Sequence, residues 1–227
     1  MIDSEVPPSV PNPCQLSVPN MTWMLTDDIV EKTAGIWTLR SPLAAPDQGW
    51  RIDCGDAGEV DQLLAIGSSV PMPVFQEADS PLEDLVVHYR QALEPGISLD
   101  VRYQLLTVSP ARLVLQATYA VQTRAFETHP ALQIAVPKLQ QTELATINRS
   151  HIGSFHVAVV MQACDVAQAN LIDDGKTSRV NFYGDFMERG VIRKCRLRII
   201  LSPLSEQELQ ADQELEALSR EPLPLVS

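Results

Sequence analysis

The sequence predicts an α+β fold, in which an antiparallel β-meander or a half-barrel is packed by a capped central helix and a C-terminal helix. Three observations support this prediction. A capping pattern at residues 80–83 precedes a one-sided apolar stripe that ends near residue 93. From residue 99 the apolar spacing changes from about 3.6 to about 2, which is typical of strands. Tight turns without intervening helices join the alternating runs, and such connections favour antiparallel pairing.

The central helix is predicted over residues 80–93. Ser80 is the expected N-cap, Pro81 occupies the first helical position, and Glu83 closes a capping box. The sequence Glu-Pro-Gly at residues 94–96 ends the segment. The apolar stripe consists of Leu82, Leu85, Val86, Tyr89 and Leu93.

Three other helices are predicted from capping residues. The segments, with their caps, are residues 27–35 (Thr26), residues 57–66 (Asp56) and a final helix through about residue 219 (Ser205 with Glu208). Acidic residues in the first turn of the segment after Thr26 suit the helix dipole.

The strands are predicted from alternation and turn residues. Residues 101–108 and 112–123 alternate well and are separated by Ser-Pro-Ala at 109–111. A short strand over residues 132–136 stops before Pro137, and residues 155–172 form a long alternating run. Asp174-Gly175 then indicates a hairpin, followed by strands over 178–187 and 191–201 that are joined by a turn at 188–190.

Domain organisation follows from composition. Five prolines among residues 1–20 predict a flexible tail, because proline removes backbone donors. All three tryptophans lie within residues 21–78, which indicates a packed region. That region either joins the core of a single domain over residues 21–220 or forms a subdomain, and residues 221–227 are expected to be a second tail.

The net charge limits the partners that this protein can bind. The 227 residues are 45% hydrophobic and carry a net charge of −12, which disfavours nucleic acid and anionic membranes as partners. The charge is uneven: residues 1–100 have 16 acids and 4 bases, residues 101–200 have 7 acids and 12 bases, and residues 201–227 have 6 acids and 1 base. The basic middle either lies against the acidic flanks or meets an anionic ligand or partner.

Cysteine usage and apolar runs bear on the compartment. The four cysteines are far apart without a CxxC pair, and the first residues do not resemble a signal peptide. The longest apolar runs fall far short of the roughly 20 residues that a membrane span needs. We therefore expect a cytoplasmic protein with reduced cysteines and no membrane partner.

Several common catalytic motifs are absent from the sequence. It contains no GxSxG elbow, no P-loop and no dinucleotide-binding glycine fingerprint. This removes the common nucleotide-dependent classes and leaves the identity of any cofactor open.

The densest chemical feature is a basic segment, with 5 of the 17 basic residues between positions 189 and 198. If residues 188–190 form a three-residue turn, Phe182 lies opposite Arg196 on a hairpin whose one face is basic and aromatic. Such a face can bind an anionic ligand by charge and stacking. The alternative is a solvated face that pairs with the acidic final helix. The candidate ligand-binding residues are Phe182, Lys194, Arg196 and Arg198.

An enzymatic alternative rests on histidine. His151 or His156 could serve as a general base that Asp165 or Asp185 orients. A spacing of five does not place two histidines on one strand face, and no HxH or HExxH motif occurs, so no metal site is predicted. Cys54 follows Asp53 at a potential helix start, where a thiolate nucleophile is the alternative to a small packed cysteine.

Together these features predict a non-catalytic domain that binds a small anionic molecule or a protein partner through its antiparallel sheet. The alternatives are a hydrolase or isomerase that uses a histidine base, and a homo-oligomeric structural protein whose sheet pairs across a two-fold axis.

Overall fold

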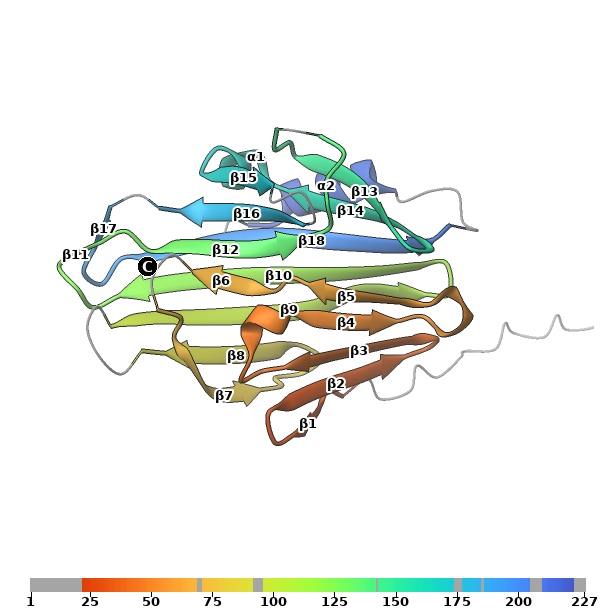
Figure 1. Cartoon of the computed structure of the whole chain (residues 1–227), viewed down its shortest axis with the longest axis horizontal. Helices are drawn as coiled ribbons and strands as arrows, with labels where there is room; N and C mark the ends of the chain where they lie inside the picture. Colours follow the sequence, from red (N-terminus) through yellow and green to blue (C-terminus); the bar gives the residue numbers. More distant parts are fainter. Residues whose placement is uncertain are drawn as a thin grey trace, which may run out of the picture.

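The strands of this protein form two packed layers of antiparallel sheet in a computed structural model (Figure 1). The structure describes residues 22–68, 71–91, 96–141, 143–173, 177–184, 186–204 and 210–222. Most strands run along the long axis of the molecule (Figure 1). A seven-stranded sheet forms one layer, and a five-stranded and a four-stranded sheet form the other.

The five-stranded sheet is a meander in chain order. Its strands are β1 (Met24–Thr26), β2 (Ile29–Ala34), β3 (Trp37–Pro42), β4 (Trp50–Asp53) and β5 (Glu59–Leu63). Burial alternates along β2 and β3, so one face of the sheet enters the core and the other meets solvent.

The seven-stranded sheet has the order β13-β14-β18-β10-β9-β8-β7. Its strands are β7 (Val74–Asp79), β8 (Leu85–Arg90), β9 (Ile97–Ser109), β10 (Arg112–Thr123), β13 (Ile147–Ile152), β14 (Phe155–Met161) and β18 (Ile192–Pro203). The β9–β10 hairpin confirms the predicted strand pair around residues 109–111.

The remaining strands complete the second layer. The four-stranded sheet contains β6 (Ile66–Ser68), β12 (Ala131–Val136), β15 (Ala169–Asp173) and β16 (Ser178–Tyr183), and a two-stranded ladder joins β11 (Glu127–Thr128) to β17 (Met187–Glu188). Backbone hydrogen bonds link Leu64 and Ala65 to Ala135, so the two smaller sheets are continuous at this point.

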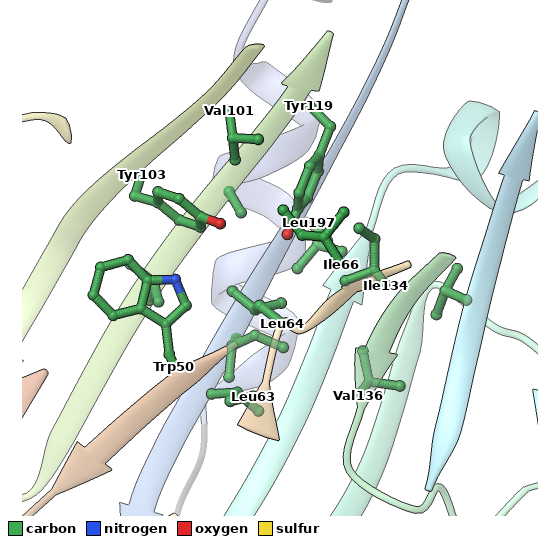
Figure 2. Close-up of a cluster of buried hydrophobic side chains, with 14 of the residues drawn as sticks. Trp50, Leu63, Leu64, Ile66, Val101, Tyr103, Tyr119, Ile134, Val136 and Leu197 are labelled. Atoms are coloured by element: carbon green, nitrogen blue, oxygen red, sulfur yellow. The ribbon is translucent and has the colours of Figure 1, made fainter. Parts of the chain in front are cut away.

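The core fills the space between the layers (Figure 2). The indole of Trp50 packs edge-on against Tyr103 with ring centroids 5.0 Å apart, and Trp23 lies 5.5 Å from the same indole. Leu197 and Tyr119 from the seven-stranded sheet face residues of β12 and β6 (Figure 2). The tryptophan-rich first strands therefore contribute to the same buried cluster as the later sheets.

Helices are few and short in the described residues. They are the 3₁₀ turns η1 (Pro46–Gln48) and η2 (Gly55–Ala57), α1 (Ala163–Val166) and α2 (Ala211–Arg220). Helix α2 lies on the outer face of the seven-stranded sheet, where its Leu218 joins an apolar cluster with Val160 and Ile200. Within the described ranges, no helix has the length and apolar content that a membrane crossing requires.

The predicted α+β class with a capped central helix was wrong, because the protein is mostly β. Residues 85–90 form strand β8, in which Leu85, Val87 and Tyr89 are buried while the intervening residues are half-buried. Leu82, the expected first member of a helical stripe, is 95% exposed in a turn. The apolar positions fit both the helical period of about 3.6 and the strand period of 2. The β-branched and aromatic residues of the segment Val-Val-His-Tyr at 86–89 favour a strand, which pairs with β9.

Other local predictions also differ from the structure. Residues 27–35 form a turn and β2, and residues 57–66 contain mainly strand, so neither predicted helix exists. The run over residues 155–172 divides into β14, α1 and β15. The C-terminal helix is present as α2, but its predicted caps at 205 and 208 lie outside the described residues.

Candidate functional site

A groove crosses the outer face of the seven-stranded sheet beside the end of helix α2. It has a volume of about 400 Å³. Its lining comes from β8, β9, β10, β18 and the two residues after the helix, and it consists of Val86, Asp100, Val101, Arg102, Gln104, Gln116, Thr118, Ala120, Lys194, Arg196, Glu221 and Pro222. We call this feature the outer groove.

Strand alternation places the polar side chains of the outer groove. In β9, Leu99, Val101 and Tyr103 are buried toward the core, so Asp100 and Arg102 project from the opposite face. In β18 the same rule buries Cys195, Leu197 and Ile199 and turns Lys194, Arg196 and Arg198 outward. The basic residues therefore share the outer face, as the sequence predicted for these three.

The strand register arranges these side chains in rows across the sheet. One row runs Val86, Arg102, Thr118, Arg196, and the next runs His88, Asp100, Ala120, Lys194. Strand β10 carries the small side chains of Thr118 and Ala120 in these rows, whereas β18 beside it carries the long side chains of Arg196 and Lys194. The groove thus has a low floor at Thr118 and Ala120, with long side chains as walls.

A third row forms a hydrogen-bonded ladder that borders the groove. Gln104 Nε2 donates to the carboxylate of Asp84 at 3.2 Å, and Gln116 Nε2 donates to Gln104 Oε1 at 3.0 Å. Arg198 Nε donates to Gln116 Oε1 at 2.8 Å, and its Nη1 reaches Glu214 Oε2 at 2.9 Å. The ladder links the turn before β8, the three strands β9, β10 and β18, and helix α2 through polar side chains.

Glu221 fixes two of the basic residues. Its Oε2 accepts from Arg196 Nη1 at 2.6 Å, and its Oε1 accepts from Arg198. Both guanidinium groups are buried, so their charges are compensated by this carboxylate and by Glu214. The alternative prediction was a solvated face that pairs with the acidic final helix. Arg198 does pair with Glu214 in α2, but Arg196 and Arg198 are buried, so the face is not solvated at these two residues.

Lys194 differs from these arginines. It is half-buried, and it makes no ion pair or side-chain hydrogen bond within the part of the chain that the structure describes. Asp100, in its row, already pairs with His88 at 2.8 Å and with Arg90 at 2.5 Å. In addition, the buried Nε of Arg196 makes no hydrogen bond to any described residue. Among the described residues, the outer groove therefore holds a cation, Lys194, that no carboxylate compensates.

The structure does not bring Phe182 to this site. Phe182 lies on β16, is fully buried, and belongs to the core between the layers. The predicted hairpin register was wrong, because β16 pairs with β12 and β15 while β18 pairs with β10 and β14. Positive φ angles at Tyr183 and Gly184 end β16 before the turn at 188–190, and β17 pairs with β11 instead.

The residues of the enzymatic alternative are not assembled in the described residues. His156 lies near the start of β14, whereas Asp165 lies in α1 beyond its end. Asp185 lies outside the described residues. Cys54 is buried, and burial together with Asp53 raises the pKa of its thiol, which opposes thiolate formation.

Sequence reasoning missed the groove residues outside β18. Arg102, Gln104, Gln116 and Thr118 occupy alternate polar positions within apolar strands, which is the only local signal that they share a face. Their proximity to β18 depends on the β10–β18 pairing, which no turn in the sequence announces.

No protein-family model and no curated protein matches the chain. One solved structure, "Putative kojibiose phosphorylase from human microbiome", is similar over 89% of this chain at 9% sequence identity with a TM-score of 0.44. The match spans 34% of that chain, about a third of its length.

Proposed function

We propose that this protein is a binding domain and that the outer groove takes a small anionic molecule bearing hydroxyl groups. The observation that carries the proposal is the state of Lys194: a cation without a carboxylate partner among the described residues, beside a floor of small side chains. A half-buried ammonium without a partner favours an anion from outside the chain.

The surrounding groups suit the rest of such a ligand. Arg196 lines the groove together with Lys194, and the Glu221 carboxylate holds its guanidinium in place, so this side chain is preorganised. Thr118 and the Gln104–Gln116 pair can exchange hydrogen bonds with hydroxyl groups. The chemistry therefore points to a carboxylated or phosphorylated sugar or polyol rather than to an apolar molecule.

Lys194→Gln tests the proposal. The probes are glucuronate and glucose 6-phosphate, with glucose as the neutral control, and binding is followed by isothermal titration calorimetry and by amide chemical shifts. We expect at least one anionic probe to bind the native protein and to lose about tenfold or more in affinity in the variant, since a charge-assisted contact is worth about 1.5–3 kcal/mol.

Arg179→Gln is the matched control, because it removes one exposed positive charge from β16 of the other layer. Equal losses in both variants would mean that the probes respond to overall charge. That result, or no binding of either anionic probe to the native protein, would overturn the proposal.

A further inference from the structure

His151 and His156 face each other across the β13–β14 hairpin. They are direct cross-strand partners, and their ring centroids are 4.7 Å apart. A spacing of five does not place two side chains on one face of a single strand. In a hairpin whose turn is Gly153-Ser154, the same spacing places the two residues opposite each other.

The position within the hairpin brings the two side chains close. Ile152 and Phe155 close the two-residue turn, and Gly153 has the positive φ of 51° that such turns use. The closing pair of a two-residue hairpin is the hydrogen-bonded one, so the next pair is non-hydrogen-bonded, with closer side chains. His151 and His156 occupy that next pair.

We infer that this histidine pair binds a divalent late transition-metal ion such as Ni²⁺ or Zn²⁺. An imidazole nitrogen lies about 2.0–2.1 Å from such an ion, which puts each ring centroid about 3.2 Å from it. Two rings at a ligand–metal–ligand angle between about 90° and 109° then have centroids about 4.5–5.2 Å apart. The observed 4.7 Å lies within this interval.

The surroundings permit a cation at this position. Strand β13 is the edge of the seven-stranded sheet, and His151 is exposed, so an ion can reach the pair from solvent. Arg149, two residues before His151 on the same strand face, approaches Asp212 at 3.5 Å, which offsets its charge. Imidazole suits Zn²⁺, Cu²⁺ and Ni²⁺ rather than Mg²⁺ or Ca²⁺.

Two protein ligands make an open site. Among the described residues no group of three or more His, Cys, Asp or Glu side chains is placed to share an ion. Structural zinc sites use four protein ligands, whereas here the remaining positions fall to water or to an external ligand. The ion is therefore exchangeable.

The test is a calorimetric titration of the full chain with Ni²⁺ and Zn²⁺, with Mg²⁺ as the negative control. Thiols bind the same ions, so the titrations use a protein that carries the double substitution Cys14→Ser/Cys164→Ser, which we call the background protein. We expect one ion per chain, no heat with Mg²⁺, and a rise in the melting temperature with added Ni²⁺.

Single substitutions distinguish a chelating pair from two separate histidines. If the pair chelates, His151→Gln and His156→Gln each lower the affinity about tenfold or more, because the second contact is intramolecular. His129→Gln, at an exposed histidine elsewhere, should leave the affinity unchanged. Unchanged affinity with reduced stoichiometry in either single variant, or no metal binding by the background protein, would overturn the inference. Melting temperatures without metal verify that each variant is folded.

Discussion

Arg198 on β18 donates from Nε to Oε1 of Gln116 on β10 at 2.8 Å, beneath the first turns of helix α2. The two residues are cross-strand partners, and both are buried. The guanidinium also reaches Glu214 and Glu221, so one arginine satisfies an amide and two carboxylates. This places Arg198 in the framework of the outer groove, at the point where helix and sheet are joined.

Replacing Arg198 should therefore change stability more than binding. In Arg198→Met, Glu214 and Glu221 lose a buried cation and Gln116 loses its donor, and breaking such a buried pair costs about 3–5 kcal/mol. Arg40→Met is the control, because Arg40 pairs with Glu31 at an exposed position, where an ion pair is worth about 1 kcal/mol or less. The measurement is urea unfolding with constant m-values. Similar losses in the two variants would show that the Arg198 network does not stabilise the fold.

Glycine at position 49 is required by a close approach of two backbone segments. Gly49 has φ of 65°, and a Cβ added there would lie 2.6 Å from the carbonyl oxygen of Leu63. Gly35 has nearly the same φ, 63°, with nothing within 4 Å of the added Cβ. The two positions thus separate backbone strain from steric overlap.

We expect Gly35→Ala to lower the free energy of unfolding by about 1–2 kcal/mol, because alanine is strained in the left-handed conformation. Gly49→Ala should cost this amount plus about 1–3 kcal/mol for overlap with backbone atoms that cannot move away easily. Chemical denaturation of both variants gives the difference. Equal free energies of unfolding would mean that the β5 backbone relaxes around the new methyl group.

The strand pairings explain which parts of the fold could be predicted from the sequence. The β9–β10 hairpin was predictable, because alternation and turn residues are local signals. That Lys194, Arg196 and Arg198 share one face of a strand was predictable from alternation alone. Their partners were not, because β18 pairs with β10 and β14 across long stretches of chain.

The predicted central helix failed for a related reason. Ser80, Pro81 and Glu83 fit a helix start, but they form a turn in which Asp84 N donates to Pro81 O. The apolar residues that follow can face the core with either period. Pairing with β9 on one side and β7 on the other satisfies the backbone of residues 85–90 and selects the strand.

Asp165 should give the protein a pH-dependent stability. Burial raises the pKa of its carboxyl to about 6, against an opposing contribution from Arg196, whose backbone N–H donates to Asp165 Oδ2 at 3.4 Å. The native state therefore holds this proton more tightly than the unfolded chain, in which the ordinary pKa is 3.8. Its contribution to stability is full below pH 3.8 and is lost as the pH rises through about 6.

Asp165→Asn removes this titration and keeps an oxygen that can accept the Arg196 N–H. At pH 7.5 the variant should unfold with a free energy about 2–3 kcal/mol higher than the native sequence, and at pH 4 the two should be nearly equal. Asp47→Asn, at an exposed residue, is the control for replacing a carboxylate by an amide. Urea unfolding at both pH values measures the differences. A stabilisation that is the same at pH 4 and pH 7.5 would show that the Asp165 carboxyl does not titrate in this range, and the benefit would then come from the amide itself.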